Sequence, residues 1–130
     1  MDVWTVVLVF VGSALGGACR WMLAAWVDGV TPGHFPVGTL VVNASGALLI
    51  GVGWVALLAA PLGTAVWIAP LFLKGFLGGY TTVSGFCQQT LQLVLAGDLR
   101  EAFLNVAGSY ALCLVCVFLG AAAGKVIFGI

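Results

Sequence analysis

Apolar residues fill four long stretches of the chain, and short polar segments separate these stretches. The stretches cover residues 4–27, 36–60, 66–96 and 102–128. Each is long enough to cross a bilayer as a helix, which takes about 20 predominantly apolar residues. Turn-forming residues occupy the connections, for example residues 28–35. We therefore predict a single domain over residues 1–130 that consists of four transmembrane helices.

Composition decides between a helical and a barrel-shaped membrane protein. Hydrophobic residues make up 63% of the chain and charged residues only 6%, whereas soluble domains carry about 25% charged residues. Lipid is then the expected solvent, and the backbone must satisfy its hydrogen bonds within helices or a closed barrel. A barrel would alternate apolar and polar residues along each strand. The uninterrupted apolar runs of this chain favour an all-α fold.

Positive charges give almost no bias for orientation in the membrane. In the four-helix arrangement, Lys74 and Lys125 lie toward the face that carries the termini, and Arg20 and Arg100 toward the opposite face. Lys and Arg near helix ends normally set the orientation. Either a partner or the translocon decides, or the chain inserts both ways and assembles as an antiparallel dimer. We favour the dimer, because four helices leave little room for a pore within one subunit.

Glycines four residues apart are typical of close helix contacts in membranes. Three such pairs occur, at Gly12 and Gly16, Gly75 and Gly79, and Gly120 and Gly124. The pairs support association between subunits. Each single pair could equally well pack helices within one subunit.

Polar residues within apolar stretches are costly in lipid and therefore indicate function. Arg20 could attract an anion, or it could extend to the interface beside Trp21 and place positive charge at a vestibule. Asn43 has an amide with two N–H donors, which could serve an ion or an interhelical hydrogen bond. On the fourth stretch, Asn105, Ser109 and Cys113 are spaced i, i+4, i+8 and form a weakly polar stripe.

The third stretch is unusual in its middle. Residues 75–86 contain four glycines, two threonines and a serine. This composition predicts a break in the helix, with the alternative of a flexible but continuous helix. A broken backbone at membrane depth is tolerated where it is buried in protein or lines a cavity. It frees carbonyls for a small cation and N–H groups for an anion.

Acidic residues are confined to the ends of the predicted helices. No Asp or Glu occurs between Asp2 and Asp28, or between Asp28 and Asp98. A proton-coupled exporter normally needs a carboxylate within the membrane, and no nucleophile–base pair suggests an enzyme. We interpret Asp98 as the N-cap of the fourth helix, with Glu101 as its capping-box partner.

Three segments together resemble the CrcB/Fluc family of fluoride channels over nearly the whole chain. Residues 16–21 (GGACRW) are similar to a glycine pair followed by arginine and an aromatic residue. Residues 38–43 (GTLVVN) are similar to the family's G-T-L-x-V-N motif. Residues 75–86 (GFLGGYTTVSGF) are similar to its G-F-x-G-G-F-T-T-F-S-T-F motif.

The resemblance implies an antiparallel, dual-topology dimer with two fluoride pathways along its interface. It implies that Asn43 donates a hydrogen bond to fluoride, that Phe86 faces the ion with its ring edge, and that Ser109 belongs to a polar track. It also implies that the backbone carbonyls of Gly78 and Thr81 from both subunits hold one structural sodium ion at the dimer centre.

The chain departs from the family pattern at three positions. Val83 stands where the family usually has phenylalanine, Gly85 where it has threonine, and Gln89 where it often has glutamate. The loss of a ring at Val83 implies an altered pore, or a heterodimer whose homologous partner subunit supplies the ring. Tyr80 is another candidate to cover the gap.

The functional expectation is a passive, fluoride-selective channel that exports cytoplasmic fluoride and reduces its toxicity. Its expected location is the inner (plasma) membrane, as a multi-pass protein. Its expected partners are fluoride, the lipid bilayer and a second subunit in the opposite orientation, without nucleic acid. The alternatives are a small multidrug-resistance-type exporter, one subunit of a heterodimeric fluoride channel, and an accessory subunit that transports nothing.

Overall fold

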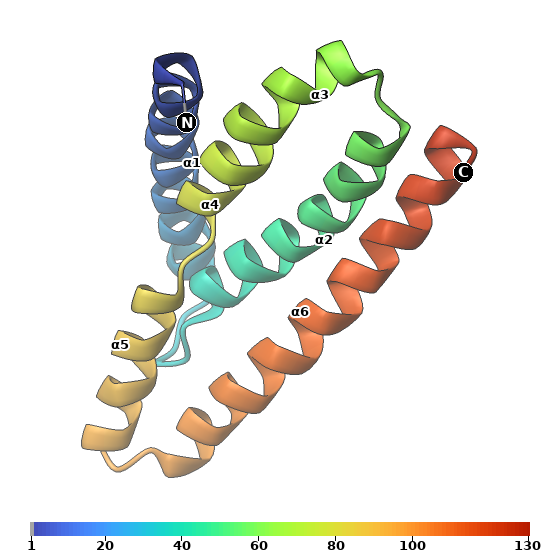
Figure 1. Cartoon of the computed structure of the whole chain (residues 1–130). Helices are drawn as coiled ribbons and strands as arrows, with labels where there is room; N and C mark the ends of the chain where they lie inside the picture. Colours follow the sequence, from blue (N-terminus) through green and yellow to red (C-terminus); the bar gives the residue numbers. More distant parts are fainter. Residues whose placement is uncertain (1) are drawn as a thin grey trace.

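The computed structural model describes residues 2–130, which form helices joined by short turns. Their order is α1 (Val3–Val30), α2 (Val37–Ala59), α3 (Leu62–Ile68), η1 (Ala69–Phe76), α4 (Leu77–Tyr80), α5 (Val83–Leu95) and α6 (Leu99–Phe128). The chain runs back and forth between the two ends of the molecule, and both termini lie toward the same end (Figure 1). The prediction of an all-helical fold is confirmed.

Three of the described helices are long and apolar enough to cross a membrane, namely α1, α2 and α6. Their bounds lie close to the predicted stretches 4–27, 36–60 and 102–128, because uninterrupted apolar runs specify them. The predicted stretch 66–96 is instead divided among α3, η1, α4 and α5. The prediction of a break in this stretch is correct.

The segment η1 is a π-helix, a feature that the sequence pattern did not predict. It spans Ala69–Phe76 and carries Pro70 in its first turn and Lys74 in its last. Proline has no N–H and cannot donate the hydrogen bond that a regular α-helix requires. The helix is therefore already irregular one to two turns before it breaks.

Two of the glycine pairs bring α1 against the third stretch. A Cβ atom on Gly12 would collide with the backbone of Leu71 and Phe76, and one on Gly16 with the backbone of Phe76 and Tyr80. In return, a Cβ on Gly79 would collide with Ser13. These glycines permit backbone contact within one chain, which is the alternative role that the sequence left open for them.

The third pair acts in the same way between α2 and α6. A Cβ on Gly120 would collide with the carbonyl of Leu48, and one on Gly124 would lie 2.8 Å from Cβ of Val55. From the other side, a Cβ on Gly51 would collide with the carbonyl of Val117. Reciprocal small residues thus fix the approach of α2 and α6.

Helix capping differs from the prediction. Asp98 occupies the N-cap position of α6, but its side chain makes no capping hydrogen bond, and Glu101 lies 4.0 Å from Arg100. A carboxylate from another helix caps α2. Oδ1 of Asp28 accepts a hydrogen bond of 2.7 Å from the Gly38 N–H at the start of α2. Asp28 reaches this helix from the end of α1, and local sequence spacing cannot show such a contact.

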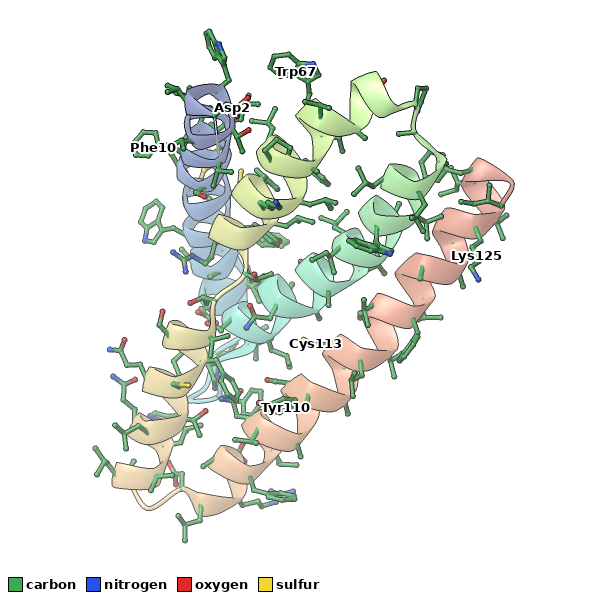
Figure 2. All side chains as sticks on the ribbon, viewed as in Figure 1. Asp2, Phe10, Trp67, Tyr110, Cys113 and Lys125 are labelled. Carbon is green, nitrogen blue, oxygen red and sulfur yellow. The ribbon has the colours of Figure 1, made fainter. Side chains whose placement is uncertain are left out.

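Large apolar side chains cover much of the exterior. Phe10 and Trp67 project outward (Figure 2), and Phe10 is 74% exposed. Exposed apolar surface on this scale requires lipid or another protein as its environment. The fold is that of an integral membrane protein.

Candidate ion-binding cavity at the broken helix

The break lies at Thr81 and Thr82, between α4 and α5. Both residues have extended backbones, with φ −77° and ψ 156° at Thr81 and φ −146° and ψ 124° at Thr82. Thr82 then begins α5, because its hydroxyl oxygen accepts a hydrogen bond of 3.1 Å from the Gly85 N–H. The threonine pair inside the glycine-rich segment thus provides both the interruption and the new helix start.

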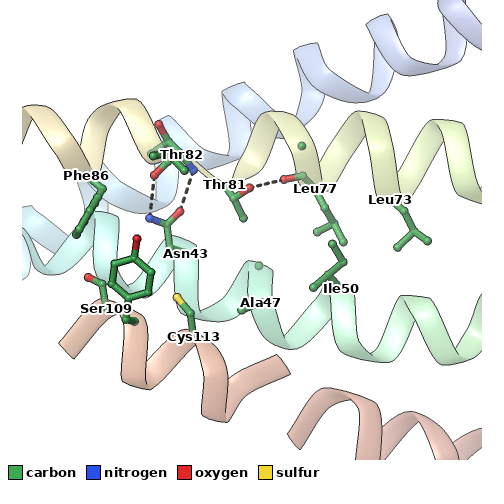
Figure 3. Close-up of a pocket in the computed structure, with 14 residues that line it drawn as sticks. Asn43, Ala47, Ile50, Leu73, Leu77, Thr81, Thr82, Phe86, Ser109 and Cys113 are labelled. Carbon is green, nitrogen blue, oxygen red and sulfur yellow. Dashed lines mark hydrogen bonds between the residues drawn. The ribbon is translucent and has the colours of Figure 1, made fainter. Parts of the chain in front are cut away.

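Asn43 holds the break in place from α2. Its Nδ2 donates to the carbonyl of Thr82 at 3.0 Å, and its Oδ1 accepts from the Thr82 N–H at 2.8 Å. Figure 3 shows this pair of hydrogen bonds. The amide therefore replaces backbone partners that the broken helix has lost. An amide nitrogen carries two N–H groups, so a second donor remains after the bond to Thr82.

The break also redirects the N–H groups that would normally bond to Gly78 and Thr81. In a continuous α-helix the N–H of Thr82 would donate to Gly78, and that of Gly85 to Thr81. Here the first donates to Oδ1 of Asn43 and the second to Oγ1 of Thr82. Side chains thus take up the two donors that would otherwise occupy these carbonyls.

A cavity of about 400 Å³ opens beside the break, between α2, the third stretch and α6. Figure 3 draws its fourteen lining residues, none of which is charged. The lining comprises Asn43, Gly46, Ala47, Ile50, Leu73, Leu77, Gly78, Thr81, Thr82, Val83, Phe86, Ser109, Tyr110 and Cys113. The cavity contains amide and hydroxyl groups on a mainly apolar wall.

Seven residues that the sequence singled out meet in this cavity. They are Asn43, Gly78, Thr81, Val83, Phe86, Ser109 and Cys113. Tyr110 also lines the cavity, although it lies outside the predicted stripe. Its position next to Ser109 was the only sequence signal for it.

Phe86 contacts Tyr110 of α6 directly and is linked to Asn105 of α6 through Thr90 of its own helix. Its ring meets the ring of Tyr110 nearly at a right angle, with 6.4 Å between the centroids. Its carbonyl accepts a hydrogen bond of 2.8 Å from the hydroxyl of Thr90. The hydroxyl oxygen of Thr90 in turn accepts a hydrogen bond of 2.8 Å from the buried amide of Asn105. Asn105 therefore supports Phe86 from outside the cavity.

Two other predicted pathway residues do not line this cavity. Tyr80 is buried and stacks on Phe76. Its hydroxyl lies 2.8 Å from Oγ of Ser45. Because Ser45 uses its single hydrogen for the carbonyl of Val42, Tyr80 is the donor in this pair. Arg20 is half-buried on α1, one turn beyond the contact of Gly16 with α4.

The arrangement suits a small ion that loses water without meeting a fixed charge. The N-terminus of α5 carries partial positive charge and opens on the cavity at Val83. The carbonyls at the end of α4 carry the opposite polarity. A helix break that presents both kinds of backbone end is the way in which channels and transporters bind ions within the membrane.

The fold and the cavity thus define a small integral membrane protein with its polar groups gathered at a helix break. The chain belongs to the CrcB family, because the family model for CrcB-like proteins (Camphor Resistance) matches residues 7–121. It is similar to the fluoride-specific ion channel FluC 3 of Brucella suis, with 43% identity over 92% of this chain and 91% of the relative. It is also similar to the fluoride-specific ion channel FluC of Thermus thermophilus, with 41% identity over 99% of this chain and 100% of the relative.

Proposed function

We propose that this protein is a passive, fluoride-selective channel that lets fluoride leave the cytoplasm. Membership of the CrcB family and the names of its relatives support a channel. The observation that carries the proposal is the uncharged cavity at the helix break, where Asn43 keeps one amide donor and Phe86 lines the same space. The positive edge of an aromatic ring attracts an anion without binding a cation.

The chemistry of hydrogen fluoride gives such a channel a purpose. Neutral HF crosses the inner membrane, ionises at cytoplasmic pH and is trapped as fluoride. A passive anion path in that membrane lets the ion drain without an energy source. The exporter alternative has less support, because none of the cavity-lining residues is a carboxylate and the relatives are named as channels.

A second copy in the opposite orientation would complete the pathway. Supporting this, Val83 is 75% exposed and Tyr110 66% exposed at the open side of the cavity. A Cβ atom on Gly78 would meet nothing within 4 Å, so this face has room for a partner. With two copies, four spans per chain would enclose two pathways. A homologous partner subunit remains the alternative to a second copy.

A structural sodium ion at the dimer centre fits the residues present. The carbonyls of Gly78 and Thr81 are the two whose usual N–H donors are diverted to side chains. Neutral backbone oxygens of this kind replace the hydration shell of a monovalent cation. Two subunits would offer four such oxygens, and the ion would hold both breaks together. Replacing sodium with a large organic cation should then weaken the purified dimer, and an unchanged dimer would contradict this part.

Fluoride efflux from liposomes tests the proposed function. Vesicles that contain the purified protein and are loaded with potassium fluoride should release fluoride to an external electrode when valinomycin balances the charge. Vesicles loaded with chloride should retain their anion, and vesicles without protein should retain both. Retention of fluoride by vesicles that contain folded protein would contradict the channel and leave the accessory-subunit alternative.

A further inference from the structure

We infer that Tyr110 is a further residue of the ion pathway and that its hydroxyl donates a hydrogen bond to the permeating fluoride. The inference deepens the proposed function and depends on it. It starts from position, because Tyr110 lines the cavity together with Val83 and Phe86. Figure 2 places Tyr110 and Cys113 along the same stretch of α6.

The cavity offers few donors to an anion. The hydroxyl of Thr81 donates to the carbonyl of Leu77 at 2.9 Å. The hydroxyl of Thr82 lies 3.1 Å from that of Ser84 and also caps α5. One N–H of Asn43 is used by Thr82. The hydroxyls of Thr81 and Thr82 thus already have partners within the chain, whereas Asn43 keeps one N–H and Ser109 also lines the cavity.

The end of the cavity at Val83 needs a donor most. Val83 is 75% exposed there and presents only methyl groups. An anion that loses water beside such groups pays a large desolvation cost. The phenol of Tyr110 lines the same cavity, and an O–H donor to an ion makes a stronger hydrogen bond than a neutral pair.

A contact with Phe86 holds the phenol in position. Its ring meets Phe86 edge to face, with an interplanar angle of 87°. Phe86 is itself tied to α6 through Thr90 and Asn105. Tyr110 is nevertheless 66% exposed, so its outer part is available to solvent or an ion rather than buried in the protein.

Two substitutions separate the hydroxyl from the ring. Tyr110→Phe removes only the O–H and keeps the contact with Phe86, whereas Tyr110→Leu removes both. If the hydroxyl serves the ion, fluoride efflux from liposomes should fall roughly tenfold in Tyr110→Phe, as expected for one lost hydrogen bond to a charged group. Tyr110→Leu should be at least as slow.

A matched control lies on the same helix. Phe118 is 71% exposed and does not line the cavity, so Phe118→Leu should leave efflux near the wild-type rate. Size-exclusion profiles and thermal unfolding midpoints establish that all three variants are folded. If Tyr110→Phe keeps the wild-type efflux rate while Tyr110→Leu is slow, the ring of Tyr110 only packs against Phe86. That result would overturn the inference. An inactive wild-type protein would instead contradict the proposed function itself.

Discussion

At the scale of single residues, the side chain of Asn43 combines a structural contact with the proposed contact to the ion. It bonds both backbone groups of Thr82, a residue 39 positions later in the sequence. The amide suits this task because it donates and accepts at the same time. Its remaining N–H is a donor whose direction is fixed by the other two bonds.

Asn43→Asp should stop fluoride flux. A carboxylate places a fixed negative charge beside an anion path, where low dielectric makes the repulsion large. It also has no N–H for the carbonyl of Thr82, so the break loses one of its two hydrogen bonds. Fluoride efflux from liposomes measures the effect, and size-exclusion chromatography checks the fold. Normal flux in a well-folded variant would remove Asn43 from the pathway.

Val83→Phe should raise fluoride flux or leave it intact. Valine cannot offset the lost hydration of fluoride, whereas a phenylalanine adds a positive ring edge at the mouth of the cavity. Val83→Leu is the matched control, because it adds apolar volume without a ring and should give no gain. Efflux rates of the three proteins in liposomes decide the matter. Loss of flux in folded Val83→Phe would mean that the resemblance assigns the wrong role to this position, and the assignment of Phe86 would then need revision.

At the scale of helices, the sequence predicted those elements whose pattern is uninterrupted. For α1, α2 and α6, the apolar runs gave bounds within a few residues. The break also followed from composition, since residues 75–86 concentrate glycine and threonine. The π-helix before the break could not be predicted from composition, because one proline can end, kink or widen a helix. Packing against neighbouring helices determines which of these outcomes occurs.

Helix packing shows which of two roles the glycine pairs have within the chain. A spacing of four residues shows that one helix face is small, but it does not identify the helix that approaches. The structure pairs Gly16 with the backbone of Phe76 and Tyr80, within the same chain. Backbone contact of this kind tolerates no side chain.

Gly16→Ala should therefore destabilise the protein, because its Cβ would force α1 away from α4. Gly108→Ala is the matched control on α6, where a Cβ atom meets nothing within 4 Å. Alanine favours a helix over glycine by roughly 1 kcal/mol, so this control should be neutral or slightly stabilising. Thermal unfolding of both variants in detergent is the measurement. Equal midpoints for the two variants would contradict the packing role of Gly16.

At the scale of the whole molecule, the cavity assembles residues that are far apart in the sequence. The apolar stretches suggested which polar residues matter, but not that Ser109, Phe86 and Asn43 line one space. Tyr80 illustrates the limit, because its ring lies in the packed interface with Ser45 rather than in the cavity. Distances across helices depend on crossing geometry, which residue spacing alone does not specify.

Balanced charge at the two ends of the molecule gives the last prediction, that this chain expressed alone inserts in both orientations. Arg100 and Lys125 lie at opposite ends of α6, so each end of this helix carries one positive charge. Lys74 and Arg20 lie farther inside, within η1 and α1. Since Lys and Arg near helix ends determine orientation, neither end of the molecule is favoured on the cytoplasmic side. A reporter fused to the C-terminus should give signal from both sides of the membrane.

One substitution can test the cause of this balance. Lys125→Gln leaves Arg100 as the positive charge at an end of α6. The end that carries Arg100 should then stay in the cytoplasm, so the C-terminal reporter should shift to the outer side. Val126→Gln, on a residue that is 85% exposed, is the control that changes polarity without charge and should keep both signals. A single orientation in the unmodified chain would exclude dual topology and, with it, an antiparallel dimer of identical subunits.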